Sequence, residues 1–265
     1  MSPAARVFAV LGDPVGHSLS PAMHTAAFRA LGIDASYVAL PVGPAELEPV
    51  MRALTRSGGG GNLTVPHKRA GARLLRAADG GSLRSGNTFW GHDGELIGAD
   101  TDPAGILAGW QSVGAPAGAW LVLGTGGSAL AAARAAGAVR AGVVCRSRSP
   151  QRATDFAAEI AGLGIPLAPP GAPIGVVLNC TPLGLAATDP LPLAAGEIPP
   201  GAAAVDLVYG KGGTPWTRAL AARQIVAIDG RVTLVGQGAA AFECWFPGVR
   251  APVEVMRAAV EAALA

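Results

Sequence analysis

The chain has few charged and few aromatic residues for its length. Of 265 residues, 14% are charged and 5% are aromatic, and the formal net charge is +2. Nucleic acids and anionic membrane surfaces select strongly basic proteins, so this balance argues against either as a partner. No uncharged apolar run reaches the roughly 18 residues that a membrane-spanning helix needs. The N-terminal residues also lack the pattern of a signal peptide.

Cysteine and histidine are scarce as well. The three cysteines have no metal-binding spacing and lie in apolar contexts, which is typical of buried thiols in a reducing compartment. The four histidines form no H-x-x-x-H or H-E-x-x-H pattern, so we predict no metal site. A Gly-x-Ser-x-Gly turn is missing too, which argues against that type of serine hydrolase. We therefore expect a cytoplasmic protein with a sizeable core, since half of its residues are hydrophobic.

Glycine is abundant, with 38 residues, and one glycine-rich run is the most informative part of the chain. The apolar segment 121–123 ends in GTGGSA at 124–129, a Gly-x-Gly-x-x-Ala pattern, and an alanine-rich helical pattern follows to about residue 136. A strand, a tight glycine turn and a helix place a pyrophosphate at the N-terminus of that helix. The run therefore predicts a Rossmann-type dinucleotide-binding unit.

The segment after the next predicted strand indicates which dinucleotide binds. That strand, 141–145, ends without a carboxylate and is followed by Arg146-Ser147-Arg148-Ser149. NAD sites carry Asp or Glu here for the ribose 2′-hydroxyl, whereas NADP sites carry an arginine for the 2′-phosphate. Guanidinium groups and hydroxyls suit a phosphate monoester. The segment predicts NADP(H), with a solvated basic turn as the alternative.

Predicted strands and helices alternate along the chain, which is typical of an α/β fold with helices on the faces of a parallel sheet. The expected strands are 6–11, 35–42, 61–65, 120–123, 143–145, 175–179 and 203–208, with a hairpin at 88–98 turning on Asp93-Gly94. The expected helices include 21–31, 44–54, 66–78, 103–113, 232–245 and 251–264. We expect two lobes: an N-terminal α/β substrate domain, 1–102 completed by 236–265, and a doubly wound dinucleotide-binding domain, 103–235.

Polar side chains gather where the predicted strands of the first lobe end. Ser18 and Ser20 follow the first strand, and beside a helix N-terminus they would hold a small carboxylate. The alternative is a turn residue followed by an N-cap. Asn62, Thr64 and Lys68 lie at a strand-to-helix junction, where the lysine is either a proton donor to a substrate or a solvated side chain. Asp102 is either the N-cap of the next helix or the partner of that lysine.

Taken in order, nine segments resemble the shikimate dehydrogenase family. They are GDPVGHSLSPAMH, NLTVPHK, SGNT, DTDPAG, VLGTGGSA, CRSRSPQRA, NCTPLG, DLVYGKGGTP and VGQGAAAFECW, and they extend from residue 12 to about residue 245. The resemblance implies NADPH-dependent reduction of 3-dehydroshikimate to shikimate, a step toward aromatic amino acids. It also implies that the C-terminal helices return to the first lobe.

The resemblance further implies a role for each matching residue. Lys68 and Asp102 would be the catalytic pair. Ser18 and Ser20 would bind the substrate carboxylate, and the other expected substrate-binding residues are Asn62, Thr64, Asn87, Tyr209 and Gln237. NADP would be held by Gly124, Thr125, Gly126, Gly127, Ser128, Arg146, Ser147, Arg148, Asn179, Thr181, Leu207 and Gly230.

Several positions depart from the family pattern. Asp100 replaces the usual Asn, Thr233 the usual Met, and Thr125 a frequent Ala. A quinate or aminoshikimate dehydrogenase of the same fold stays open as an alternative. A non-catalytic NADP-binding sensor is disfavoured by the intact Lys68 and Asp102, and a methylene-tetrahydrofolate-type dehydrogenase would not explain the serine pair. The expected partners are small molecules, with the chain acting as a monomer or homodimer.

Overall fold

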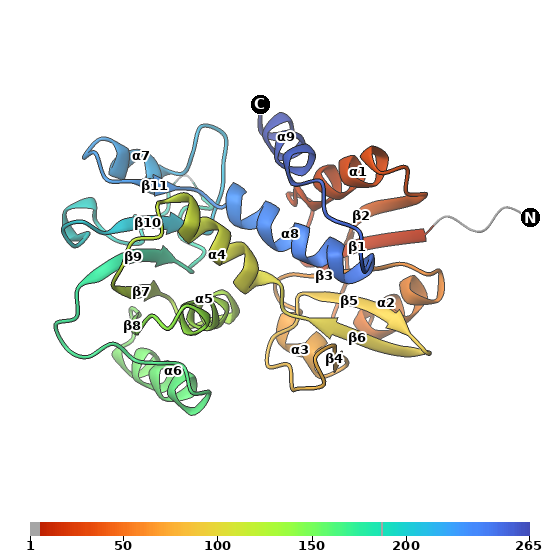
Figure 1. Ribbon diagram of the computed structural model, residues 1–265, viewed down its shortest axis with the longest axis horizontal. Helices are drawn as coiled ribbons and strands as arrows, with labels where there is room; N and C mark the ends of the chain where they lie inside the picture. The colour runs from red at the N-terminus through yellow and green to blue at the C-terminus, as the bar shows by residue number, and fades with distance from the viewer. Residues whose placement is uncertain (1–5, 187) are drawn as a thin grey trace, which may run out of the picture. The chain divides into compact units, whose positions relative to one another are not determined.

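The computed structural model describes residues 6–186 and 188–265. The chain divides into two compact units. Unit 1 is made of Met1–Thr101 and Leu234–Ala265, and unit 2 of Asp102–Thr233. Figure 1 shows that each unit contains its own sheet with helices packed against it.

Unit 2 is built on a five-stranded parallel sheet in the order β11-β10-β9-β7-β8. Its strands are β7 (Ala119–Leu123), β8 (Val143–Arg146), β9 (Ile174–Asn179), β10 (Ala203–Asp206) and β11 (Ala227–Ile228). Its helices are α4 (Asp102–Ser112), α5 (Gly127–Ala138), α6 (Pro150–Gly162), the 3-10 helix η1 (Ala195–Glu197) and α7 (Pro215–Ala221). Because β7 lies between β8 and β9, the strand order reverses beside it, at the place where such sheets bind nucleotides. The predicted doubly wound arrangement is confirmed.

Apolar clusters cover both faces of this sheet. On one face, Trp120 and Val122 of β7 pack with α4, α5 and α6; on the other, Leu121 and Leu123 pack with α7 and the segment around η1. The side of α5 toward the sheet consists largely of fully buried alanines, from Ala129 to Ala136. Such small side chains let the helix approach the strand closely, which holds its N-terminus at the end of β7.

Unit 1 is built on a six-stranded mixed sheet in the order β2-β1-β3-β5-β6-β4. Its strands are β1 (Arg6–Gly12), β2 (Ala35–Pro41), β3 (Gly60–Leu63), β4 (Arg76–Ala77), β5 (Thr88–His92) and β6 (Glu95–Ala99). Its helices are α1 (Ser20–Ala30), α2 (Leu47–Arg56), α3 (Lys68–Ala72), α9 (Val253–Leu264) and most of α8 (Arg231–Trp245). The first three strands run parallel and β5 runs antiparallel to both of its neighbours.

The two faces of this second sheet are also apolar. Phe8 and Val10 of β1 pack with α1, α8 and α9, and the alternate residues Ala9 and Leu11 pack with α2. This alternation is the period-2 pattern of a strand that is buried on both sides. The C-terminal helices therefore complete the core that the first strand begins.

The predicted hairpin is confirmed, with Asp93 at φ 51° and Gly94 at φ 79°, as a type I′ turn requires. Two local predictions are wrong. The helix expected over 66–78 ends at Ala72, because residues 76–77 pair in parallel with Ile97 and Gly98 of β6 instead. Ser20 is not the N-cap of α1: the cap is Leu19, and the oxygen Oγ of Ser18 accepts a 3.3 Å bond from the backbone N–H of Ser20.

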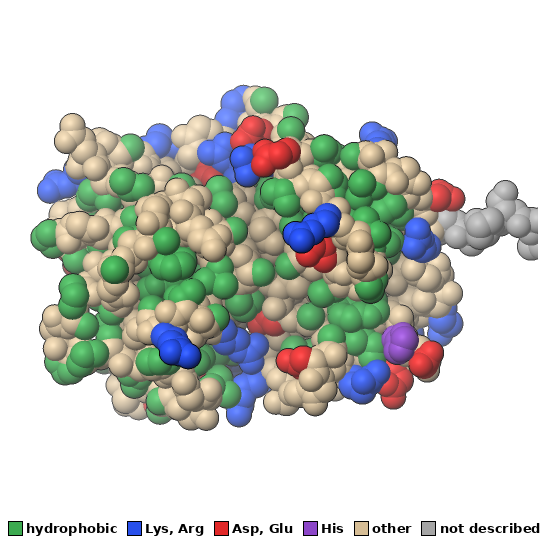
Figure 2. All heavy atoms as spheres, in the orientation of Figure 1, with side chains coloured by type: hydrophobic (Ala, Val, Ile, Leu, Met, Phe, Trp, Pro, Cys, Tyr) green, Lys and Arg blue, Asp and Glu red, His purple; other side chains and the backbone are tan. Residues whose placement is uncertain are grey.

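The surface carries charges of both signs. On the face drawn in Figure 2, basic and acidic side chains occur in small groups separated by apolar and uncharged atoms. This distribution accords with the formal net charge of +2. Among the described residues, no helix combines the length and the apolar character that crossing a membrane requires.

Candidate active site and cofactor pocket

A pocket of about 410 Å³ lies in unit 2 at the carboxyl ends of β7 and β9. The backbone N–H of Gly124 bonds to the carbonyl of Arg146, and that of Cys180 to the carbonyl of Leu123, so three strand ends meet here. Gly124 has φ +111°, a conformation that favours glycine, and nothing lies within 4 Å of the place where a Cβ of Gly126 would be. The open backbone at the N-terminus of α5 fits a pyrophosphate.

The pocket is lined by Gly124, Thr125, Gly126, Ser147, Arg148, Ser149, Arg152, Cys180, Thr181 and Pro182. Six of the predicted cofactor residues are therefore in its wall. Gly127 and Ser128 begin α5 directly beside it. The thiol of Cys180 is no candidate nucleophile, because burial raises its pKa well above the usual range.

The basic side of the pocket differs in detail from the sequence-based expectation. Arg148 and Arg152 line it, whereas the guanidinium of Arg146 donates to the carboxylate of Glu197 at 2.9 Å. That ion pair lowers the pKa of Glu197. Sequence reasoning missed Arg152, and it included Ser149 only as part of the basic segment 146–149. Both belong to the start of α6, where Ser149 is the N-cap and accepts a bond from the N–H of Arg152.

Asn179 does not line the pocket but holds Thr181, which does. Its side chain is fully buried, and Oδ1 accepts bonds from the N–H and the hydroxyl of Thr181 at 3.0 and 2.6 Å. Its Nδ2 donates to the carbonyl of Leu183 and to Asp206. Because the amide makes four intramolecular bonds, Asn179 fixes the loop that follows β9.

Asp206, at the end of β10, holds the next loop in the same way. Its Oδ1 accepts bonds from the N–H of Val208 at 3.0 Å and from Asn179, and its Oδ2 accepts one from the hydroxyl of Thr214 at 2.7 Å. One carboxylate thus holds both the backbone of Val208 and the side chain of Thr214. Burial raises the pKa of Asp206, and the three donors oppose that shift.

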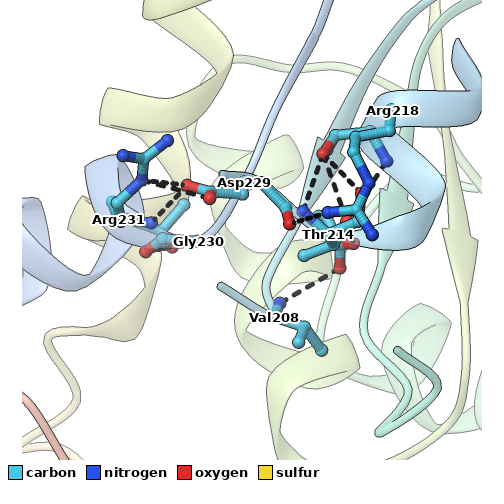
Figure 3. Close-up of polar contacts among 10 residues, drawn as sticks. Val208, Thr214, Arg218, Asp229, Gly230 and Arg231 are labelled. Carbon is cyan, nitrogen blue, oxygen red and sulfur yellow. Dashed lines mark hydrogen bonds and ion pairs between the residues drawn. The ribbon is translucent and has the colours of Figure 1, made fainter. Parts of the chain in front are cut away.

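The loop tied down by Asp206 carries two predicted site residues, Leu207 and Tyr209. A third, Gly230, lies against it: its N–H bonds to the carbonyl of Val208 at 2.9 Å, and a Cβ there would collide with the carbonyl of Leu207. Asp229 and Arg231, which flank Gly230 in the sequence, form an ion pair at 2.8 Å (Figure 3). Leu207 and Gly230 are thus brought together outside the pocket described above.

Replacing Thr214 by valine is expected to lower the free energy of unfolding by about 2 kcal/mol, since it removes a donor to a buried carboxylate and the N-cap of α7. Thr214→Ser keeps both bonds and is expected to stay within about 0.5 kcal/mol of the parent protein. Urea denaturation of the three proteins measures the difference. Equal stability of the valine and serine variants would show that the carboxylate does not need this hydroxyl.

The predicted substrate residues of unit 1 lie at the ends of its strands. Ser18 follows β1, and Ser20 opens α1 with its side chain buried. Thr64 and Lys68 follow β3, with Lys68 as the first residue of α3.

Hydrogen bonds connect three further predicted residues. Nδ2 of Asn62 donates to the carbonyl of Asn87 at 3.1 Å, and Nδ2 of Asn87 donates to Oε1 of Gln237, on α8, at 3.3 Å.

Asp102 and Tyr209 belong to unit 2, whereas Lys68 and the other substrate residues belong to unit 1. The pairing of Lys68 with Asp102 therefore stays a prediction. Within residues 6–186 and 188–265, no group of three His, Cys, Asp or Glu side chains is arranged to hold a metal ion.

Two models of known protein families match this chain, one in its N-terminal part and one in its C-terminal part. Residues 10–87 match the shikimate dehydrogenase substrate binding domain, and residues 230–261 match the shikimate 5'-dehydrogenase C-terminal domain. The shikimate dehydrogenase (NADP(+)) of Symbiobacterium thermophilum is 39% identical over 281 residues, which cover 98% of this chain and 95% of that protein. The chain belongs to the shikimate dehydrogenase family.

Solved structures of the family agree over nearly the whole chain. A shikimate dehydrogenase in complex with NADP+ has a TM-score of 0.87 at 27% identity, covering 98% of this chain and 96% of its own. The Thermus thermophilus shikimate 5-dehydrogenase in complex with shikimate has a TM-score of 0.84 at 35% identity, covering 97% and 98%. The predicted family and its two-domain α/β fold are confirmed.

Proposed function

We propose that this protein reduces 3-dehydroshikimate to shikimate with NADPH, a step toward aromatic amino acids. The observation that carries the proposal is the pocket at the end of β7, where two arginines and no carboxylate follow the glycine turn. The relatives that match this chain over more than nine-tenths of its length are named as NADP(+)-dependent shikimate dehydrogenases.

The residues of the pocket fit NADP group by group. The turn from Gly124 to Ser128 would hold the pyrophosphate at the N-terminus of α5. Arg148 and Arg152, with Ser147, would hold the 2′-phosphate, because guanidinium groups bind phosphate oxygens through paired N–H donors. Arg146 would act from the edge of this site, since Glu197 holds its guanidinium. Asn179, Thr181, Leu207 and Gly230 would form the wall on the nicotinamide side.

We assign substrate binding to unit 1 and cofactor binding to unit 2. Ser18 and Ser20 would bind the carboxylate of the substrate, and Asn87 and Gln237 its ring hydroxyls, with Thr64 of unit 1 and Tyr209 of unit 2 lining the site. Asn62 would contribute through Asn87, because its own amide is occupied by intramolecular bonds.

Bound NADPH supplies the hydride for the ketone carbon. The ammonium group of Lys68 would stabilise the negative charge that develops on the ketone oxygen and would donate a proton to that oxygen. Asp102 would orient the ammonium group. Water must be excluded from the reacting atoms, so this chemistry needs the substrate and cofactor to be enclosed together.

A spectrophotometric assay tests the function directly. Purified protein is expected to reduce NADP+ with shikimate and to act poorly with quinate, because relatives that match nearly the whole chain are named as shikimate dehydrogenases. Turnover of quinate in preference to shikimate would assign the alternative function within the same fold. Binding of NADP+ without turnover of either substrate would assign a non-catalytic sensor. Action as a monomer or homodimer in the cytoplasm is part of the same proposal.

Cofactor preference gives a second test. Arg148→Ala is expected to raise the KM for NADP+ by about 30-fold and to leave the KM for NAD+ within about two-fold, because the lost contact is with the 2′-phosphate alone. Arg223→Ala, an exposed arginine of the same unit away from the pocket lining, is the control. Equal losses with both cofactors would show that Arg148 makes no 2′-phosphate contact.

A further inference from the structure

A continuous set of buried hydrogen bonds links Tyr37, on β2, to the predicted substrate residues of unit 1. The phenol is 4% exposed, and its ring stacks on His24 with centroids 4.5 Å apart. Burial raises the pKa of Tyr37 well above its usual value, although a side-chain hydrogen bond with Ser20 opposes the shift, so the hydroxyl stays protonated. This hydroxyl donates to Oδ1 of Asn62 at 2.7 Å.

Two neighbours hold the Asn62 amide in one orientation, the hydroxyl of Tyr37 on its oxygen side and the backbone carbonyl of Asn87 on its nitrogen side. With Oδ1 toward the phenol, Nδ2 donates to the carbonyl of Asn87 at 3.1 Å and to the hydroxyl oxygen of Thr88 at 3.0 Å. The reversed amide would place its oxygen against the carbonyl oxygen of Asn87, and the phenol would have to accept a hydrogen bond where it now donates one. The hydroxyl of Thr88, which accepts from Asn62, donates to Oδ1 of Asn87 at 3.0 Å and lies 3.1 Å from the hydroxyl of Thr101.

The Asn87 amide is oriented from a second side by Thr101. Its Oδ1 accepts the backbone N–H of Thr101 at 2.8 Å and the Thr101 hydroxyl at 3.1 Å. Its Nδ2 therefore faces Gln237, whose Oε1 lies 3.3 Å away. Nε2 of Gln237 donates in turn to the carbonyl of Leu234 at 2.9 Å. A backbone N–H and a backbone carbonyl cannot exchange roles, so every amide between them has one consistent orientation.

We propose that Tyr37 is a positioning residue of the substrate site, which acts through Asn62 and Thr88 and, together with the backbone N–H of Thr101, keeps the N–H donors of Asn87, and not its side-chain oxygen Oδ1, directed toward the side where Gln237 lies. The proposal rests on the proposed function. It adds a rule of recognition: the substrate must offer Asn87 an acceptor, such as a hydroxyl oxygen, and an N–H group at that position of the ring would be rejected.

The test is Tyr37→Phe, which removes the hydroxyl and keeps the ring that packs on His24 and Trp245. The KM for shikimate is expected to rise about ten-fold, since a buried amide loses its orienting donor. The kcat and the KM for NADP+ are expected to stay within about two-fold. The proposal would be overturned by an unchanged KM for shikimate. It would also be overturned if kcat fell and the KM for NADP+ rose by the same factor as the KM for shikimate.

A double-mutant cycle separates positioning from general loss of stability. In the Asn87→Ala background, Tyr37→Phe is expected to change the KM for shikimate by less than about two-fold, because the residue through which it acts is gone. A full ten-fold effect in that background would contradict the proposal. Trp245→Phe is the matched control: it removes another buried N–H bond, to the carbonyl of Phe89, from the same aromatic cluster. It is expected to lower the melting temperature without a change in the KM for shikimate.

A measurement on the protein without substrate tests the positioning role independently of the proposed function. The side-chain amide protons of Asn62 and Asn87 are expected to exchange slowly with solvent in the NMR spectrum, and faster in Tyr37→Phe. Equal exchange in both proteins would overturn the positioning role whatever the substrate. Failure of the parent protein to oxidise shikimate, with faster amide exchange in the variant, would overturn the proposed function and leave the orienting bond established.

Discussion

Replacement of Lys68 by alanine is expected to lower kcat by about 10³-fold while the affinity for NADPH stays within about two-fold. The lysine opens α3 directly after β3, at the strand end where the predicted substrate residues of unit 1 gather. Its ammonium would both stabilise the developing oxyanion and protonate it. Alanine offers neither contribution, whereas the cofactor pocket lies within unit 2 and is left intact.

The neighbouring residue provides the control for this prediction. Arg69 is exposed on the same short helix. Arg69→Ala removes one positive charge and places one alanine in this helix, as Lys68→Ala does, and the variant is expected to keep near-normal turnover. Steady-state rates with 3-dehydroshikimate and NADPH, together with the quenching of protein fluorescence by NADPH, separate catalysis from binding. Near-normal turnover of Lys68→Ala would remove the lysine from the mechanism.

Acidification is expected to destabilise the protein through His24, by roughly 3 kcal/mol between pH 6.5 and pH 4. The imidazole is fully buried among Phe28, Tyr37 and Trp245, and neither ring nitrogen has a hydrogen-bond partner among the described residues. Burial lowers its pKa from 6.5 to about 3. Between these two values the unfolded chain binds a proton that the folded chain does not, so the free energy of unfolding falls as the pH decreases.

His24→Phe is expected to remove most of this pH dependence, because the aromatic cluster keeps a ring of similar shape without a titrating group. His92 is exposed in the β5–β6 hairpin, and His92→Gln is expected to leave the dependence unchanged. Urea denaturation of the three proteins at several pH values from 7 to 4 measures the slopes. The same slope in His24→Phe as in the parent protein would assign the acid sensitivity to other groups.

The features that could be predicted from the sequence are those specified by neighbouring residues. The turn at Gly124 and the hairpin at Asp93-Gly94 each need a backbone conformation that their own residue types favour. The longer strands of both sheets follow from local apolar patterns and were predicted within a few residues, whereas the two-residue strands β4 and β11 were not predicted. The helix expected beyond Ala72 failed because pairing between β4 and β6, which are distant in sequence, replaces it.

The details of the site depended on partners that are far apart in the sequence. Arg146 and Glu197 are 51 residues apart, and no local pattern indicates that this arginine would pair outside the pocket while Arg152 lines it. The bond between Asn179 and Asp206 spans 27 residues, and that between Tyr37 and Asn62 spans 25. Such side chains look like independent polar residues in the sequence, although each supports another.

The division of unit 1 between the two ends of the chain has a consequence for synthesis on the ribosome. Phe8 packs on Trp245 and Phe246, with ring centroids 4.8 and 5.6 Å apart, so one face of β1 is covered by α1 alone until the last helices have been translated. Unit 2 is encoded without interruption and has all of its residues available earlier. The nascent chain thus has all of unit 2 available before unit 1 is complete, and during that interval the apolar surface of β1 that α8 and α9 will cover is open to aggregation and to chaperones.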